Sequence, residues 1–92
     1  MEQLIAVFDA QGMSRTQYDQ VINDLERAGA GAPKGRLTHF AAPKEDGFTV
    51  IDVWESRADL EHFAGVLFPI LARNGVEPPA PDVRPLHNRI DA

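Results

Sequence analysis

The sequence contains no cysteine among its 92 residues. This absence excludes disulfides, thiolate nucleophiles, iron–sulfur clusters and cysteine-type zinc sites, and it is typical of proteins in a reducing compartment. No apolar run approaches the roughly 20 residues that a transmembrane helix needs. The apolar segment 4–8 follows an acidic residue, Glu2, and lacks the basic start and the length of a signal peptide. We therefore expect a cytoplasmic protein that does not enter a membrane.

Basic residues are scarce as well. Nine Lys and Arg stand against 14 Asp and Glu, which gives a formal net charge of −5. A scattered set of cations on an acidic chain provides no attraction to phosphate backbones or anionic lipid, so we expect no nucleic-acid partner. The chain also lacks a glycine-rich phosphate loop, a GxSxG elbow and an HExxH motif. These absences disfavour nucleotide hydrolysis and serine hydrolase chemistry, and the sequence predicts no metal and no cofactor.

The composition that remains is that of an ordinary globular protein, with 43% hydrophobic and 25% charged residues. We expect one domain spanning residues 1–92. The predicted elements are a strand over 3–9, a helix over 15–28, strands over 36–42 and 48–55, a helix from 57 to about 73, and a last strand over 82–90. Ser14 and Gln17 form a capping box before the first helix. Pro69 is expected to kink or split the second helix near Phe68.

This order predicts an α+β fold of the ferredoxin-like βαββαβ type. Right-handed crossovers place both helices on one face of a four-stranded antiparallel sheet. The split βαβ arrangement puts the first and third strands in the centre and the others at the edges. Two local signals agree with it. Residues 4–8 are all apolar, as in a central strand, and Pro85 favours an edge because proline cannot donate a ladder hydrogen bond.

The helix-free face of this sheet is also expected to be apolar. On the third strand, Phe48, Val50 and Trp54 point one way, whereas Ile51 and Val53 point the other way. Leaving five or six such side chains exposed would forgo about 10 kcal/mol of burial free energy. We therefore predict a homodimer that pairs two helix-free faces into a dimeric α/β barrel. A monomer with one apolar face is the alternative, and large exposed apolar patches argue against it.

Strand pairing brings together the residues that could carry chemistry. The Asp46-Gly47 pair predicts a hairpin. A two-residue loop would pair His39 with Trp54, and a four-residue loop would pair His39 with Asp52. Both registers put these three side chains on one face, whereas a three-residue loop with a bulge would pair residue 40 with Asp52. An imidazole beside a carboxylate can act as a general base, so His39 and Asp52 are the predicted catalytic residues. The alternative is a hydrogen-bonded polar pair that only lines a cavity or interface.

Two other polar side chains are assigned to the ligand. His87 lies on the predicted last strand and could face the same cavity, and Tyr18 lies on the apolar stripe of the first helix, where its hydroxyl could reach a pocket. His39, His87 and Asp52 together have the ligand types of a two-His-one-carboxylate metal site. No spacing motif supports such a site, and we predict no metal.

The chain resembles the dimeric α/β-barrel superfamily, and within it the small proteins like the antibiotic biosynthesis monooxygenases. Element order and length carry the resemblance over nearly the whole chain, and its local signature is the segment 53–60, VWESRADL. The resemblance implies a homodimer with a largely apolar pocket in each subunit, and activities that include cofactor-independent oxygenation, haem degradation, isomerisation and cyclisation. In the oxygenase and haem-degrading branches, the resemblance implies a tryptophan at the end of the third strand that acts with a histidine on the following helix and an asparagine on the first strand. Trp54 matches the tryptophan. Phe63 stands in place of the histidine, and the first strand has no asparagine, which disfavours haem degradation and weakens the oxygenase assignment.

If the pocket lies between the sheet and the helices, Phe63 and Leu67 line it and Trp54 closes one end. The leading hypothesis is a homodimeric barrel protein that binds a small apolar or aromatic metabolite, with monooxygenase, cyclase or isomerase activity. The alternative is a non-catalytic module that senses a ligand or forms a structural dimer.

Overall fold

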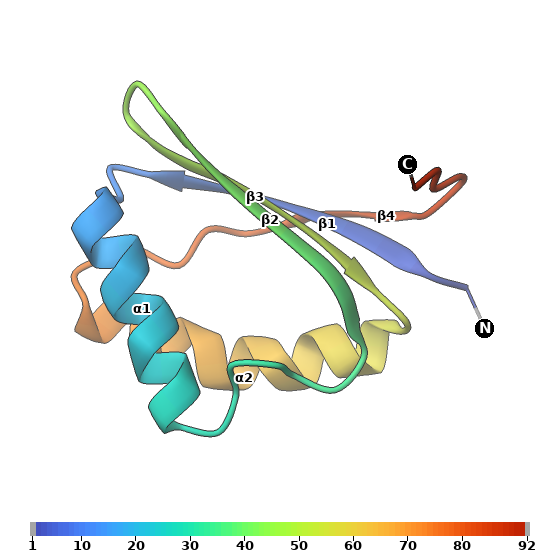
Figure 1. Ribbon diagram of the computed structural model, residues 1–92, viewed down its shortest axis with the longest axis horizontal. Coiled ribbons are helices and arrows are strands. Elements are labelled where there is room, and N and C mark those ends of the chain that lie inside the picture. The colour runs from blue at the N-terminus through green and yellow to red at the C-terminus, as the bar shows by residue number, and fades with distance from the viewer. Residues whose placement is uncertain (1, 92) are drawn as a thin grey trace.

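The computed structural model describes residues 2–91 and contains four strands and two helices in the predicted order (Figure 1). The elements are β1 (Leu4–Gln11), α1 (Arg15–Arg27), β2 (Arg36–Lys44), β3 (Gly47–Trp54), α2 (Arg57–Arg73) and β4 (Asp82–Pro85). Both helices lie on the same side of the sheet, and the other side carries no helix (Figure 1). Within residues 2–91, no helix is both long and apolar enough to cross a bilayer.

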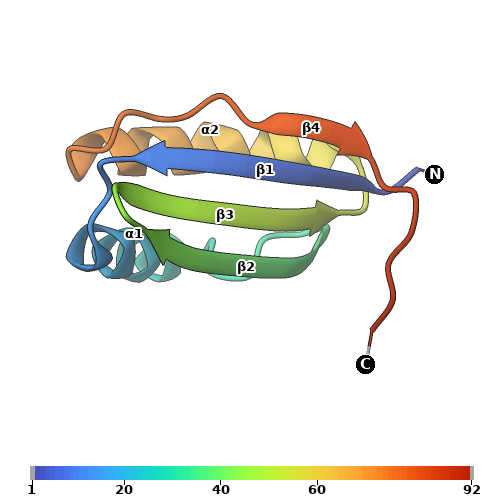
Figure 2. The ribbon, with the colours of Figure 1, turned by 90° about the horizontal axis from the view of Figure 1, so that it is seen from above.

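The strands form one sheet in the order β2-β3-β1-β4, and every neighbouring pair is antiparallel (Figure 2). β1 and β3 therefore occupy the centre, and β2 and β4 form the edges, as the sequence predicted. Side chains that lie opposite one another on neighbouring strands form rows across the sheet. On the helix side, His39 lies opposite Asp52, which lies opposite Ala6.

The ends of α1 follow the predicted capping signals. The Ser14 hydroxyl accepts a hydrogen bond from the Gln17 amide, and the Gln17 side chain accepts one from the Ser14 amide, which completes the capping box. Gly29 adopts a positive φ of 75° just after the helix, a conformation that glycine reaches without steric cost. Between these ends, Val21 and Leu25 are buried against the sheet.

The prediction that Pro69 would kink or split the second helix near Phe68 is wrong as to a split, because α2 continues through this position to Arg73. A proline inside a helix removes one hydrogen bond to the carbonyl four residues earlier, which belongs to Gly65. Pro69 and Gly65 are both exposed, so water can solvate that carbonyl. Leu71 is buried on the other face and continues the apolar stripe beyond the proline.

The last strand is shorter than the predicted range 82–90. β4 ends at Pro85, and one further backbone hydrogen bond joins the Leu86 amide to the Gln3 carbonyl over 2.8 Å. The following residues leave the sheet and extend on the side away from the helices (Figure 1). Pro85 has no N–H to give to a ladder, and beyond Leu4, where β1 begins, the bond from Leu86 to Gln3 is the last pairing contact within residues 2–91.

The β2–β3 hairpin has a two-residue turn, Glu45 and Asp46, flanked by the pair Lys44 and Gly47. Its register is the predicted alternative in which His39 lies opposite Asp52. The observed turn begins one residue earlier than the predicted two-residue loop Asp46-Gly47, and it is shorter than the predicted four-residue loop. Gly47 has a φ of 134°, and a Cβ there would lie 2.2 Å from a backbone oxygen of β1. The turn therefore packs so closely against β1 that no residue with a side chain fits in place of Gly47.

The core fills the space between the sheet and the helices. Its buried members come from β1, β3 and both helices, and they include Phe8, Leu25, Phe48, Trp54, Phe63 and Leu71. The opposite face of the sheet carries a second set of apolar side chains, which are only partly covered: Ile5, Val7 and Ile51 are half-buried and Phe40 is 62% exposed. The predicted alternation of β3 between the two faces is confirmed.

Candidate functional site

A cavity of about 50 Å³ lies between the helix side of the sheet and the two helices. Its wall is mainly apolar and is formed by side chains of the sheet, of both helices and of the turn before α1, among them Phe8, Met13, Ile22, Phe63 and Leu67. Four side chains with polar groups interrupt this wall: Tyr18, Arg36, His39 and Asp52. An apolar cavity with a few polar groups on one side is the usual form of a small-molecule site.

The histidine and the aspartate predicted to be catalytic are in direct contact. Nδ1 of His39 lies 2.6 Å from Oδ1 of Asp52, across the β2–β3 pair. Asp52 is 2% exposed, and it is the only charged residue buried within residues 2–91. A carboxylate accepts hydrogen bonds only, so it selects the tautomer in which Nδ1 carries the proton. The other ring nitrogen, Nε2, is then free to accept a proton.

Tyr18 extends this pair into a chain of three. Its hydroxyl lies 2.8 Å from Nε2 of His39, and with the tautomer that Asp52 selects, the hydroxyl donates to that nitrogen. The Tyr18 ring stacks on Phe48, with ring centroids 5.0 Å apart and an angle of 6° between the planes. Burial raises the pKa of the Tyr18 hydroxyl above its ordinary value of 10.0, so the group is neutral at physiological pH. The sequence suggested that this hydroxyl reaches a pocket, but not that it bonds His39.

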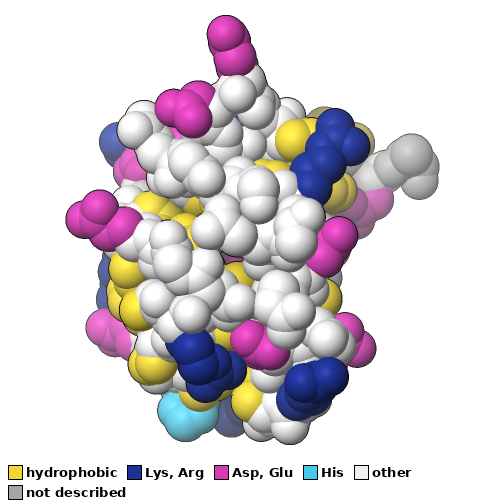
Figure 3. Space-filling model, turned by 90° about the vertical axis from the view of Figure 1, so that its left-hand side faces the viewer, with side chains coloured by type: hydrophobic (Ala, Val, Ile, Leu, Met, Phe, Trp, Pro, Cys, Tyr) yellow, Lys and Arg dark blue, Asp and Glu magenta, His cyan; other side chains and the backbone are white. Residues whose placement is uncertain are grey.

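Part of the hydrogen-bonded chain Tyr18–His39–Asp52 also reaches the molecular surface. Tyr18 and His39 line an open groove beyond the cavity, together with Arg15 and Asp19. The side of the molecule that carries α1 and the hairpin turn shows hydrophobic side chains in hollows, with charged side chains around them (Figure 3). The His39 side chain is 24% exposed, whereas that of Asp52 is 3% exposed. A proton on His39 can therefore exchange with solvent while Asp52 stays dry.

Of the three apolar side chains predicted to line or close the pocket, two lie in the cavity wall and one does not. Phe63 and Leu67 line the cavity as expected. Trp54 is fully buried behind Phe63, with ring centroids 5.4 Å apart, and does not form part of the cavity wall. Its indole Nε1 is buried and has no hydrogen-bond partner in the described part of the chain. A buried donor without a partner costs about 1–3 kcal/mol, so Trp54 stays in place through packing alone.

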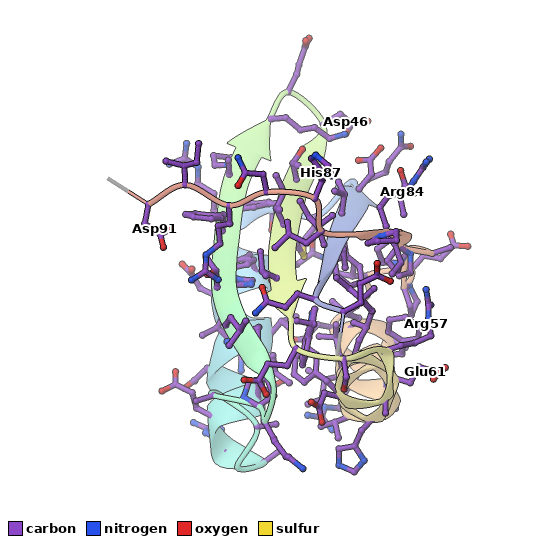
Figure 4. The ribbon with its side chains drawn as sticks, turned by 90° about the vertical axis from the view of Figure 1, so that its right-hand side faces the viewer. Asp46, Arg57, Glu61, Arg84, His87 and Asp91 are labelled. Atoms are coloured by element: carbon purple, nitrogen blue, oxygen red, sulfur yellow. The ribbon has the colours of Figure 1, made fainter. Side chains whose placement is uncertain are left out.

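The structure does not bring His87 to this site. His87 is exposed and lies on the segment after β4, on the side of the sheet opposite the helices (Figure 4). The predicted strand would have carried it along the sheet, but pairing of β4 stops at Pro85. Between residues 2 and 91, no group of three or more His, Asp or Glu side chains is arranged to hold a metal ion.

Sequence reasoning missed Arg36, which lines the cavity. Strict alternation along a strand would place residue 36 on the face opposite that of His39. A register shift between Arg36 and Thr38 leaves Leu37 as an extra residue, so that Arg36 pairs with Trp54 on the helix side. Bulges of this kind re-aim one side chain and leave no clear mark in the sequence.

These elements define the protein as a ferredoxin-like βαββαβ structure with a small cavity beneath the sheet. The sequence itself matches no family model and none of the curated proteins. Solved structures do match over almost the full chain, and they confirm the predicted resemblance as one of fold.

Two of these structures are candidate antibiotic biosynthesis monooxygenases. The one from Caulobacter crescentus is 19% identical and has a TM-score of 0.58, with 96% of this chain and 89% of that chain covered. The one from Chloroflexus aurantiacus is 15% identical, also with a TM-score of 0.58, and the coverage is 97% and 95%. Rv0793 from Mycobacterium tuberculosis is 18% identical with a TM-score of 0.54, and the coverage is 98% and 96%. At these identities the likeness establishes the fold.

Proposed function

We propose that this protein binds a small, mostly apolar or aromatic molecule in the cavity beneath the sheet and moves a proton to or from it. The observation that carries the proposal is the hydrogen-bonded chain Tyr18–His39–Asp52 on the wall of an otherwise apolar cavity. A general base held in one tautomer by a buried carboxylate is a common element of acid–base catalysis. Isomerisation, cyclisation and cofactor-independent oxygenation all contain such a proton transfer.

The proposed step conserves protons. An acidic C–H or O–H of the ligand gives its proton to the Tyr18 oxygen while the Tyr18 hydroxyl proton passes to Nε2 of His39. The ligand becomes an anion, Tyr18 remains a phenol and His39 becomes an imidazolium. Asp52 keeps its hydrogen bond to Nδ1 and stabilises the new positive charge. The imidazolium then returns the proton to another atom of the ligand, or loses it to solvent through its exposed edge.

The size of the cavity limits the ligand. Pockets for drug-sized molecules occupy about 300–1,000 Å³, and this cavity of about 50 Å³ holds only a small group. A polyketide-sized molecule would enter only if side chains such as Met13 and Leu67 moved aside. The names of two structural neighbours support a monooxygenase-like class, whereas the cavity favours small ligands or the small end of a larger one.

Proton exchange into deuterated water tests the activity. The probes are cyclohexanone and 2-oxobutyrate, whose acidic C–H groups are visible by proton NMR. We expect the protein to accelerate exchange, and His39→Gln and Tyr18→Phe to slow it by roughly 10²–10⁴-fold, the usual contribution of a general base. His62→Gln is the matched control, since His62 is exposed on α2. Binding without exchange would support the non-catalytic module instead, and equal rates in all variants would exclude the proposed chain.

We further propose that the protein is a cytoplasmic homodimer that pairs its helix-free sheet faces. Phe40, Ile51 and Val7 form one row across this face, and Thr38, Val53 and Ile5 form the next. Phe40 is 62% exposed, which is uncommon for a phenylalanine. Val53 is already buried, and contact with a second copy would cover the exposed parts of the other side chains in these rows. Each apolar side chain that becomes fully covered contributes about 1.5–3 kcal/mol, against an association cost of about 4–15 kcal/mol.

Sedimentation at micromolar concentration tests the dimer. We expect a particle of twice the 10.1 kDa chain mass and dissociation by Phe40→Glu, which would bury a charge in the interface. Glu61→Lys changes charge on the helix side of the molecule and should leave the dimer intact (Figure 4). A monomer for the unmodified chain would overturn this part of the proposal.

A further inference from the structure

We infer that Arg36 recognises an anionic oxygen of the ligand, so that the preferred ligands carry a carboxylate, or form an enolate, next to a small apolar group. This inference deepens the proposed function and rests on the same cavity. It is drawn from the position of the guanidinium group, from its unused donors and from its place relative to the proton chain.

Arg36 is the only lysine or arginine in the cavity wall. Apart from Tyr18, His39 and Asp52, the rest of the wall is apolar. The β-bulge after Arg36 is what turns this side chain toward the helices, to the same side as His39. The bulge therefore brings a positive charge to the wall of a mainly apolar cavity, where electrostatic interactions are screened less than in bulk water.

The guanidinium group is held in place but has donors to spare. It donates one hydrogen bond, from Nη2 to the Gly31 carbonyl over 3.1 Å, and its central carbon lies 5.6 Å from the centroid of the Phe63 ring. No carboxylate of residues 2–91 lies within 4.0 Å of it. An arginine has five N–H donors in a planar fork that matches a carboxylate. Four of them have no acceptor within residues 2–91, so a ligand oxygen can take that place.

The charge of Arg36 also affects the pKa of Tyr18, one member of the hydrogen-bonded chain Tyr18–His39–Asp52. Burial raises the pKa of Tyr18, and the Arg36 charge opposes that rise, which places the guanidinium group within electrostatic reach of the phenol. A ligand whose oxygen meets Arg36 would present its neighbouring C–H toward Tyr18 and His39. When that proton leaves, negative charge develops on the oxygen, and a fixed guanidinium stabilises it at the moment it forms. A small 2-oxo acid or 1,3-dicarbonyl compound has this arrangement.

Arg36 also has structural contacts, because it bonds to Gly31 in the loop before β2 and lies against the ring of Phe63 on α2. A test must therefore separate charge recognition from stability. Matched ligand pairs do this, since benzoate and benzamide, or butyrate and butyramide, have nearly the same shape but differ in charge. A loss of stability alone weakens binding of both members of a pair equally.

The experiment measures binding of each pair by the fluorescence of Trp54, the only tryptophan, which packs against the cavity residue Phe63. We expect the unmodified protein to bind each carboxylate at least 10-fold more tightly than its amide. Arg36→Gln should abolish this preference and Arg36→Lys should retain part of it. Arg57→Gln, on the exposed start of α2, should leave it unchanged (Figure 4). A preference that is absent from the unmodified protein, or that persists in Arg36→Gln, overturns the inference.

If Arg36→Gln fails to fold, the unmodified protein still provides a test. The side-chain Nε signal of Arg36 in a ¹⁵N NMR spectrum should shift on adding benzoate and not on adding benzamide, and the absence of a shift overturns the inference. The exchange assay separates this inference from the proposed function. Exchange of both cyclohexanone and 2-oxobutyrate without any carboxylate preference removes the role of Arg36 only. Carboxylate preference without exchange of either probe retains Arg36 and removes the catalytic proposal.

Discussion

The Tyr18 hydroxyl and Nε2 of His39 are 2.8 Å apart, although the two residues are 21 positions apart and belong to a helix and an edge strand. The bond exists because α1 packs on the sheet with its stripe of Val21 and Leu25 facing inward. Any change that shifts α1 along the sheet would separate the phenol from the imidazole. The hydrogen-bonded chain Tyr18–His39–Asp52 thus depends on helix–sheet packing as much as on strand register.

Asp52→Asn should destabilise the protein by about 1–3 kcal/mol, because the buried site loses a charge-assisted hydrogen bond to His39. Asp9→Asn is the matched control. Asp9 pairs with Lys44, both side chains are exposed, and removing such a pair costs about 1 kcal/mol or less. Urea unfolding of the three proteins measures the difference. Equal midpoints for the two variants would show that the His39–Asp52 bond adds nothing to stability.

The ionisation of Tyr18 can be followed alone, because it is the only tyrosine in the chain. We expect the ultraviolet signal of the phenolate to appear with a midpoint above the ordinary pKa of 10.0, mainly because the group is buried. Removing the negative charge in Asp52→Asn should lower this pKa, and removing the positive charge in Arg36→Gln should raise it further. Since the folded-state pKa is raised, the stability from the neutral phenol is present below pH 10.0 and is lost as the pH rises through the folded-state value. A midpoint at or below 10.0 would contradict the buried environment.

Asp24 should make stability depend on acid pH. Hydrogen bonds from Asn74 and Gln20, followed by one from Arg73, lower the pKa of this carboxyl below its ordinary value of 3.8. Because the folded-state pKa is depressed, the stabilisation is present above pH 3.8 and is lost as the pH falls through the folded-state value. Thermal melts of the unmodified protein should therefore decline more steeply below pH 4 than those of Asp24→Asn, about the region in which a free aspartate titrates. Parallel declines would show that Asp24 does not contribute.

Alanine substitutions at Gly35 and Gly12 distinguish the cost of backbone strain from that of steric conflict. Both have positive φ, of 86° and 75°, so alanine at either position pays for a left-handed conformation, about 1–2 kcal/mol. A Cβ on Gly35 would also lie 2.2 Å from a carboxylate oxygen of Asp59, whereas a Cβ on Gly12 would meet no atom within 4 Å. Gly35→Ala should therefore lower the unfolding midpoint more than Gly12→Ala. The reverse order in chemical denaturation would argue against the close approach of β2 to the start of α2.

Periodicity predicted the elements because each helix and strand buries one continuous side. The position of His39 beside Asp52 was within reach of sequence reasoning, since neighbouring strands joined by a short turn have only a few registers. The bond to Tyr18 was not, because it depends on how far α1 is rotated and shifted on the sheet. Arg36 was missed because a single-residue bulge reverses its face.

The end of β4 could not be predicted from its own residues. Val83 and Leu86 suit a strand, but a strand also needs a neighbour, and beyond Leu4 the bond from Leu86 to the Gln3 carbonyl is the only pairing contact within residues 2–91. The continuation of α2 through Pro69 depended on the same kind of information, namely which side of the helix faces water. Both outcomes follow from tertiary surroundings that a local pattern does not contain.

His39 lies on β2, which has a single neighbour in the sheet, whereas Asp52 lies on β3, which has two. Edge strands open locally at a lower free energy than central ones. Partial detachment of β2 would break the contact between the imidazole and the carboxylate long before the remainder of the molecule unfolds. We therefore expect local opening of β2 to limit how long the His39–Asp52 hydrogen bond persists, and amide hydrogen exchange along β2 would measure how often this opening occurs.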